Sequence, residues 1–346
     1  MNPQQQPYYG VQAYAKENPY QFFGQPFPYP GMKPYQPKQI DQAKVDADAA
    51  ALRKAMKGLG TDEKAIIQIA ANRTNRERLA MIESFKRQFN RDLRKDLKSE
   101  LSGKFEDAIL ALFMDPVDYD CWSLKKAMKG LGTNEDTLIE ILATRSNERI
   151  NQIKARYLEI YKKDLVKVVQ SDTSGFFRQV LLKLLEANRS NNPYPDQKDC
   201  NDCAKNLFFA ATQKKEILND TFLYVFTQKS REELALIAQV YYEWYRKTLF
   251  EVVKTSFSGD AKRILKAIVY ALLSPSEYFA YRVNKAVKGL GTKDTMLIRI
   301  LVSRDEIDME RIKRYYKQLY KVEMFDDVKN DVSGDYKTIL LALIGR

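Results

Sequence analysis

The sequence predicts an all-α protein made of four repeats with five helices each. A Ser-Gly pair closes each repeat at Gly103, Gly175, Gly259 and Gly334, so the repeats are 72, 84 and 75 residues apart. Within each repeat, apolar residues recur at helical and not at strand spacing. A glycine-bracketed turn also occurs three times in nearly the same form, as AMKGLGTDE, AMKGLGTNE and AVKGLGTKD. Self-similarity at a fixed period is the signature of repeat architecture.

The N-terminal segment, residues 1–41, differs from the rest of the chain. It holds eight of the twelve prolines and six tyrosines. Proline at this density prevents both helix and sheet hydrogen bonding, so we expect a disordered or partly polyproline II tail. Its tyrosines would bind a protein partner or support self-association on membranes. The alternative is a passive flexible tail.

The repeats are expected at residues 42–114, 115–188, 198–273 and 274–346. The longest connector, Asn188 to Asp199, is rich in Asn, Pro and Asp, residues that favour turns. We expect this connector to be the hinge between the two halves of the chain.

The second repeat shows the five helices most clearly. They are predicted at residues 116–130, 134–145, 147–163, 164–170 and 174–187. Thr133 is expected to cap the second helix, with Asp136 completing a capping box. In the third helix, Ile150, Ile153, Tyr157 and Ile160 are expected to share the buried face.

Composition excludes several classes of function. The chain has no histidine, which removes the commonest general base and zinc ligand, and we expect no enzymatic activity. Cys121, Cys200 and Cys203 cannot form a four-ligand zinc site without histidine or a second CxxC, so we expect reduced thiols. No apolar run is long enough for a membrane span, and the N-terminus lacks the pattern of a signal peptide. These features predict a cytoplasmic protein.

The formal net charge of +12 favours polyanionic partners: nucleic acid, acidic proteins or an anionic lipid surface. The densest basic run, Lys86 to Lys98, includes Phe89, Leu93 and Leu97 at helical spacing. We interpret it as the solvated face of one amphipathic helix. A basic binding patch is the alternative.

The repeated turn can be interpreted in two ways. A helix that ends in Lys-Gly is often only C-capped. However, Gly58, Gly130 and Gly289 are each followed by an acidic residue 42 positions later. The same offset three times favours one site made from two loops. Glycines let a loop aim successive carbonyls at one point, and calcium takes six to eight oxygen ligands. With one carboxylate, each site would bind free calcium only weakly, at about 10⁻⁴ to 10⁻³ M, and a lipid oxygen could complete the shell.

These motifs, MKGLGTDE, MKGLGTNE and VKGLGTKD, each with an acid shortly before Ser-Gly, resemble the annexin family over residues 42–346. The resemblance implies a curved disc of helices whose convex face carries calcium loops and rests on phosphatidylserine-rich membrane. Carried over by position, it implies three metal sites, each with three backbone carbonyls and one carboxylate. The ligands would be Met56, Gly58, Gly60 and Glu100 in the first repeat; Met128, Gly130, Gly132 and Asp172 in the second; and Val287, Gly289, Gly291 and Asp331 in the fourth. Glu63 and Glu135 would serve accessory sites in the same loops.

The third repeat departs from this pattern. Its loop region reads FFAATQKKEILND without glycine, and Ser256 stands at the acid position. Lys229 stands where the other repeats have Arg73, Arg145 and Arg304. We expect no calcium site here. Lys214 and Lys215 would either contact the membrane directly or be merely solvated.

The function expected from these features is calcium-dependent binding to anionic phospholipid membranes, in membrane organisation or trafficking. The alternative is a cytoskeletal or membrane-associated scaffold that acts largely without calcium. Binding to a specific nucleic acid would depend on charge alone and is not expected.

Overall fold

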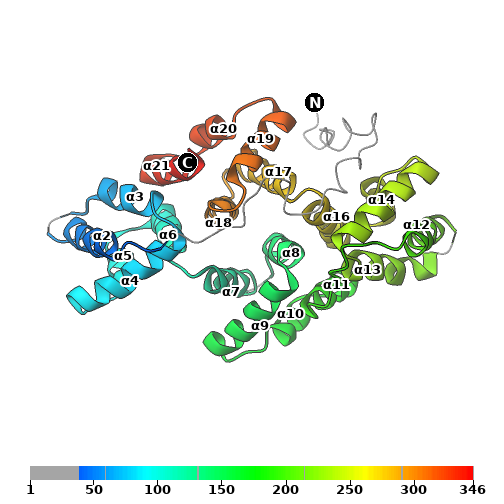
Figure 1. Ribbon diagram of the computed structural model, residues 1–346, viewed down its shortest axis with the longest axis horizontal. Helices are drawn as coiled ribbons and strands as arrows, with labels where there is room; N and C mark the ends of the chain where they lie inside the picture. The colour runs from blue at the N-terminus through cyan, green and yellow to red at the C-terminus, as the bar shows by residue number, and fades with distance from the viewer. Residues whose placement is uncertain (1–38, 59, 131, 214, 290, 346) are drawn as a thin grey trace. The chain divides into compact units, whose positions relative to one another are not determined.

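The computed structural model describes residues 39–58, 60–130, 132–213, 215–289 and 291–345 (Figure 1). These residues form α-helices, one short 3-10 helix and no strand, which confirms the predicted all-α fold. The predictions for the tail and for the side chains of Lys214 and Lys215 lie outside the described part of the chain.

Each repeat contains five α-helices, as predicted. The first repeat holds α2 (Gln42–Ala55), α3 (Glu63–Ala71), α4 (Asn75–Phe89), α5 (Leu93–Glu100) and α6 (Gly103–Leu112). The second holds α7 (Pro116–Ala127), α8 (Glu135–Thr144), α9 (Asn147–Tyr161), α10 (Leu165–Asp172) and α11 (Gly175–Leu185). The third holds α12 (Gln197–Thr212), η2 (Lys215–Ile217), α13 (Leu218–Gln228), α14 (Arg231–Tyr245), α15 (Leu249–Ser256) and α16 (Gly259–Leu273). The fourth holds α17 (Pro275–Val287), α18 (Asp294–Arg304), α19 (Met309–Tyr320), α20 (Met324–Asp331) and α21 (Gly334–Ile344).

The chain divides into two compact units, one formed by a central segment and the other by the two segments that flank it. One unit is Asp120–Tyr278, in which α8 packs on α16 and α11 packs on α13. The other combines Phe279–Arg346 with the described residues up to Tyr119, and in it α6 packs on α18 and α21 packs on α3. The second repeat therefore shares a core with the third, and the first shares one with the fourth.

This division shows that the predicted hinge is wrong. The connector after α11 lies inside one unit, where Arg189 donates hydrogen bonds to the carbonyls of Phe226 and Lys229, both at 2.7 Å. The amide of Ser190 donates to the carbonyl of Gln228 at 2.8 Å. These contacts satisfy carbonyls at the end of α13, which a helix leaves without internal partners. Composition identified a loop here but gave no information on these long-range contacts.

The buried face of α9 follows the predicted stripe except at one position. Ile150, Ile153 and Tyr157 are buried, but Ile160 is 40% exposed, so its predicted place in the core was wrong. The stripe continues four residues after Tyr157, at Tyr161, whose ring centroid lies 4.8 Å from that of Tyr157. A step of four keeps a residue on the same helix face.

Two further local predictions were wrong. Asn134, not Thr133, caps α8, because its side chain accepts the hydrogen bond from the amide of Thr137 at 3.0 Å. The basic run Lys86 to Lys98 is not one helix, since it spans the end of α4 and all but the end of α5, with Asn90 between them at φ +52°.

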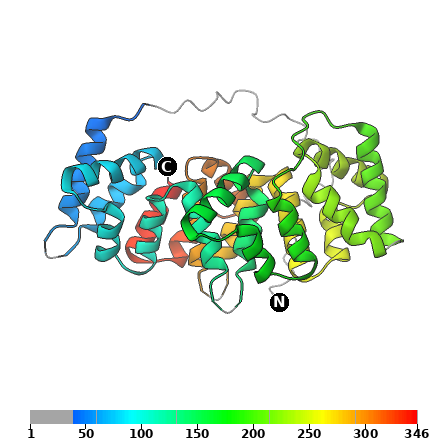
Figure 2. The same ribbon diagram turned by 90° about the horizontal axis from the view of Figure 1, so that it is seen from below.

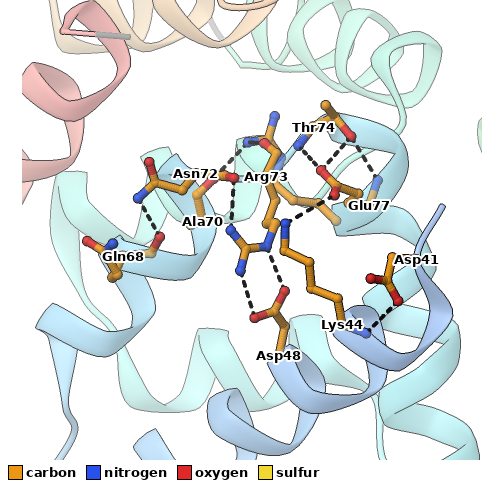
Figure 3. A network of polar contacts seen from close by, with 10 residues as sticks. Asp41, Lys44, Asp48, Gln68, Ala70, Asn72, Arg73, Thr74 and Glu77 are labelled. Atoms are coloured by element: carbon orange, nitrogen blue, oxygen red, sulfur yellow. Dashed lines mark hydrogen bonds and ion pairs between the residues drawn. The ribbon is translucent and has the colours of Figure 1, made fainter. Parts of the chain in front are cut away.

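An ion pair fixes the turn between the second and third helices of the first repeat. Arg73 Nε and a terminal guanidinium nitrogen lie 2.6 and 3.0 Å from the two carboxylate oxygens of Asp48 on α2 (Figure 3). Next to this pair, Thr74 and Glu77 form a capping box at the start of α4. The turn is therefore held by a bidentate contact to one neighbouring helix and by a cap on the next.

The other repeats vary this ion pair. In the second repeat Arg145 makes the same bidentate contact with Asp120, at 3.0 and 2.7 Å. In the third, Lys229 pairs with Asp199. In the fourth, the guanidinium carbon of Arg304 lies 4.5 Å from the ring centroid of Phe279, and Arg304 pairs with Asp308 at 2.7 Å. The substitution at Lys229 noted in the sequence is therefore matched by a change of acidic partner.

The three cysteines are buried, and none of them forms a disulfide. Burial raises the pKa of Cys200 to about 12 and that of Cys203 to about 11. Both thiols are therefore protonated and unreactive at neutral pH, since the thiolate is the nucleophile. None of the described helices is long and apolar enough to cross a bilayer.

Candidate calcium loops in three repeats

The three glycine-rich turns connect the first and second helices of their repeats. Each is closed by a backbone hydrogen bond: Asp62 to Ala55 at 2.9 Å, Asn134 to Ala127 at 2.8 Å, and Lys293 to Ala286 at 2.9 Å. In Figure 2, the loop after α2 (blue, at left) extends beyond the ends of the helices that it connects. The three copies of the motif therefore share one closing hydrogen bond.

Backbone conformation requires glycine at both positions of the first two loops and at one position of the third. Gly58 and Gly60 have φ of +120° and +85°, and Gly130 and Gly132 have +99° and +90°. An added Cβ would meet nothing within 4 Å at any of these positions, so space is not the constraint. Side chains strongly disfavour these dihedrals. In the fourth repeat Gly291 has φ +77°, whereas Gly289 lies outside the left-handed region.

The predicted acids lie at the end of the fourth helix in each of these repeats. Glu100, Asp172 and Asp331 are the last residues of α5, α10 and α20. Each is brought to its glycine loop by a threonine. Thr61 donates to Glu100 Oε2 at 3.0 Å, Thr292 donates to Asp331 Oδ2 at 2.6 Å, and Thr133 donates to the main-chain oxygen of Asp172 at 3.0 Å. The loop and the distant acid of each proposed site therefore lie together.

These threonines were missed as site residues by the sequence analysis, which treated one of them as a helix cap. A signal for them was present. Each follows the second glycine of its motif directly and precedes its acid by 39 residues. Because the hydroxyl reaches across from the loop to the acid, we assign it a positioning role.

The donor set fits a hard cation and not a transition metal. Within the described residues, no three His, Cys, Asp or Glu side chains are grouped so that they could hold a metal. What the loops offer is main-chain carbonyls at the end of a helix, which lack partners within the helix, together with one carboxylate. Met56, Met128 and Val287 stand at or just after the last turn of α2, α7 and α17. Oxygen-only donors are the type that calcium takes.

Glu63 and Glu135 are the first residues of α3 and α8, directly after their loops. Their carboxylates also favour the positive end of those helices. An accessory calcium role for them stays a prediction.

The fourth loop is braced by contacts that the other two lack. Lys288 precedes Gly289, and its Nζ lies 2.8 Å from Asp327 Oδ1. Tyr316 donates to the other oxygen of Asp327 at 2.7 Å, and Asn284 donates to the Tyr316 hydroxyl at 3.2 Å. Burial and the carboxylate of Asp327 raise the pKa of Tyr316 well above its usual value, so the phenol stays a donor.

Within the described residues, the matching positions of the other two repeats do not form this brace. In the first repeat Asp96 is paired with Arg91, at 2.6 and 2.9 Å. In the second, Val168 stands at the same position. The three loops therefore share their closure but differ in what holds the lysine before the first glycine.

The third repeat has neither half of the site. Helix α12 continues to Thr212 and is followed by the 3-10 turn η2 in place of a glycine loop. Helix α15 ends at Ser256, which has no carboxylate. Ile217 of η2 is 38% exposed.

Comparisons with known proteins agree with this architecture. A sequence model of the annexin family matches residues 47–112, 119–184, 203–268 and 278–343. Annexin A7 of Homo sapiens is 41% identical over 299 residues, which are 86% of this chain and 61% of annexin A7. Annexin A1 isoform p37 of Columba livia is 38% identical over 312 residues, 90% of this chain and 91% of that protein.

Two solved structures show the same fold. Annexin III superposes with a TM-score of 0.85 at 35% identity and covers 90% of this chain and 96% of its own. The calcium-bound annexin (Sm)1 superposes with a TM-score of 0.80 at 32% identity, over 91% of this chain and 94% of its own.

The fold and the loops define a class: all-helical proteins of four five-helix repeats that carry glycine loops facing a distant acid. The family match and the relatives make the assignment specific. This chain belongs to the annexin family. It spans about three-fifths of the length of the human annexins A7 and A11 that it matches.

Proposed function

We propose that this protein binds anionic phospholipid membranes in a calcium-dependent manner, through the loops of its first, second and fourth repeats. The observation that carries the proposal is the pairing of each glycine loop with its distant acid by a threonine hydroxyl. Family membership adds support, since annexins are known for this activity and the matching annexin (Sm)1 structure is calcium-bound. The protein would be a binding protein and not an enzyme, cytoplasmic and reversibly attached to membranes.

The carbonyls of each loop and the carboxylate of Glu100, Asp172 or Asp331 would hold one calcium ion. That ion would supply a positive charge with open coordination positions. A lipid phosphate or serine carboxylate could fill those positions, which explains why calcium and phosphatidylserine would be needed together. Three weak sites on one chain would act together through effective concentration.

Removal of the three acids tests this mechanism. In the triple variant Glu100→Gln/Asp172→Asn/Asp331→Asn, each site keeps its loop and loses its charge. We expect the calcium concentration for half-maximal binding to phosphatidylserine vesicles to rise at least about tenfold, because a calcium site loses affinity with each ligand charge removed.

A matched control removes the same charge from the third helices of the same repeats. Glu83, Glu159 and Glu310 are exposed there, and their triple substitution by Gln should leave the calcium titration within about twofold of the parent. If both triple variants titrate like the parent, the acids are not ligands. The alternative, a scaffold that acts largely without calcium, then becomes the better account.

A further inference from the structure

The three repeats with glycine loops place an aromatic ring alike in their third helices. Each of these helices pairs a buried ring with a second ring four residues later. The ring centroids lie 5.0 Å apart for Phe85 and Phe89, 4.8 Å apart for Tyr157 and Tyr161, and 4.9 Å apart for Tyr316 and Tyr320. A difference in the chemistry of the first ring therefore falls at the same point of each repeat.

The fourth repeat uses this ring to brace its loop, and the first repeat lacks the hydroxyl for it. Tyr316 donates to Asp327, eleven residues later, and Asp327 also holds Lys288 next to the first glycine. The first repeat has an acid eleven residues after its ring, Asp96, but the ring is Phe85. Its carboxylate therefore receives no such hydrogen bond.

The second repeat has the hydroxyl and lacks the acid. Val168 stands eleven residues after Tyr157 and 39 residues after Lys129, the spacings that Asp327 has from Tyr316 and Lys288. Within the described part of the chain, the buried hydroxyl of Tyr157 has no hydrogen-bond partner. A buried donor without a partner costs free energy. The second repeat therefore carries half of the brace, without its benefit.

The threonine links differ in the same direction. Thr292 donates to the carboxylate of Asp331 at 2.6 Å and to its main-chain oxygen at 3.2 Å. Thr133 donates to the main-chain oxygen of Asp172 at 3.0 Å. The acid side chain is therefore fixed by the loop threonine in the fourth repeat and not in the second.

We propose that the fourth loop binds calcium before the second, and that the residue four positions before each acid, Asp327 or Val168, sets this order. A loop already held in place loses less freedom when its ligand binds. The protein would then engage a membrane through its fourth repeat at the lowest calcium concentration, and the second repeat would add avidity as calcium rises. This inference rests on the proposed calcium function and assigns unequal affinities to its sites.

The order is tested in chains that keep one site each. Glu100→Gln/Asp172→Asn leaves the fourth site, and Glu100→Gln/Asp331→Asn leaves the second. We expect the second-site chain to need at least about threefold more calcium for half-maximal binding to phosphatidylserine vesicles, because a partly exposed ion pair has an effect of this size. An equal or lower requirement in the second-site chain would overturn the order.

Val168→Asp in the second-site chain tests the position that sets the order. The new carboxylate would accept the hydroxyl of Tyr157 and pair with Lys129, so the calcium requirement should fall about threefold. The control is Val166→Asp, which adds the same charge to α10 two residues away, on a different face of the helix. It should leave the requirement nearly unchanged. Equal effects of the two substitutions would show that residue 168 does not set the affinity.

Tyr157→Phe tests whether the hydroxyl takes part. In the second-site chain it should not change the calcium requirement, because the hydroxyl has no partner to lose. Combined with Val168→Asp, it should cancel part of the gain. An identical effect of Tyr157→Phe with and without Val168→Asp would contradict the contact.

Two measurements without lipid separate this inference from the proposed function. In chelator, hydrogen exchange of the amides next to Gly130 should be slower with Val168→Asp than with Val166→Asp, since the brace needs no metal ion. Terbium, a hard cation like calcium, should bind the fourth-site chain more tightly than the second-site chain. If the parent fails to bind vesicles in calcium, the proposed function is wrong, and these two measurements still decide the order. Equal exchange and equal terbium affinity would overturn it.

Discussion

The side-chain nitrogen of Lys288 lies 2.8 Å from a carboxylate oxygen of Asp327, which ties the fourth glycine loop to α20. Asp327 also accepts the hydroxyl of Tyr316 and is nearly buried. The loop is thereby held near its closed geometry before any ligand arrives. Preorganisation of this kind lowers the entropic cost of binding.

Asp327→Asn tests the brace. In a chain where Glu100→Gln and Asp172→Asn leave only the fourth site, we expect this change to raise the calcium needed for half-maximal vesicle binding about threefold, since a partly exposed ion pair contributes at most about 1 kcal/mol. Calcium titration of vesicle sedimentation measures it. Asp326→Asn, an exposed neighbour on α20, is the control. If Asp327→Asn and Asp326→Asn raised the calcium requirement equally, the effect would come from the loss of negative charge and not from the contact with Lys288.

Thr292→Val tests the threonine link. Valine keeps the shape of the side chain but cannot donate to Asp331, so loop and acid lose their connection. We expect at least about a tenfold higher calcium requirement in the same single-site chain, because a hydrogen bond to a charged group contributes roughly 1.5–3 kcal/mol and tenfold corresponds to about 1.4 kcal/mol. Thr292→Ser should restore most of the parent behaviour. Identical titrations of the valine and serine variants would show that the hydroxyl has no positioning role.

Asp120→Asn should lower the free energy of unfolding by about 3 kcal/mol, because it leaves the nearly buried guanidinium of Arg145 without its counter-charge. Urea unfolding followed by circular dichroism gives the change. The comparison is Glu159→Gln, which breaks the exposed pair with Arg156 on α9 and should cost less than about 1 kcal/mol. If the two variants lost similar free energies of unfolding, burial would not explain the contribution of the pair between Asp120 and Arg145.

Glu277 predicts a pH dependence of stability. Burial raises its pKa to about 7, although a hydrogen bond with Ser274 acts in the opposite direction. A carboxyl group with a raised pKa in the fold binds its proton more tightly there than in the unfolded chain. The native state therefore loses stability as the pH rises from about 4.5 to 7, and the loss is complete above that range.

Glu277→Gln removes this cost. At pH 8 it should stabilise the protein by about 3 kcal/mol, and at pH 4 it should be nearly neutral, since one pKa unit corresponds to about 1.4 kcal/mol. Unfolding midpoints at the two pH values measure the difference. A variant that is equally stable relative to the parent at both values would show that Glu277 does not titrate in this way.

The features that could be predicted from the sequence are those that recur in several repeats or follow the helical period. Glycine loops, helix stripes and the 42-residue offsets recur, so each unit supported the interpretation of the others. Two predictions were wrong by a single residue, because the helical pattern alone does not fix which of two neighbouring residues faces the core or caps the helix. Ile160 and Tyr161 are one residue apart, yet only the latter continues the stripe, and Asn134 caps α8 where Thr133 was expected.

Contacts between residues far apart in the sequence could not be predicted from local sequence patterns. The reach of Thr133 to Asp172 requires knowledge of how α10 ends beside the loop, and the brace between Lys288 and Asp327 occurs in one repeat only. The prediction of a hinge at the connector after α11 was wrong for the same reason. A loop-like composition at the connector does not show that Arg189 ties it to α13.

The most direct test of the central claim is sedimentation of the full chain with phosphatidylserine vesicles at physiological salt, once with calcium and once with chelator. The account predicts binding in calcium that reverses completely when chelator is added, because the loops require the metal ion to engage lipid. Screening limits simple attraction between exposed charges to about 8 Å at this salt concentration. Equal binding in calcium and in chelator would contradict the account and would assign the membrane affinity to the net charge of +12.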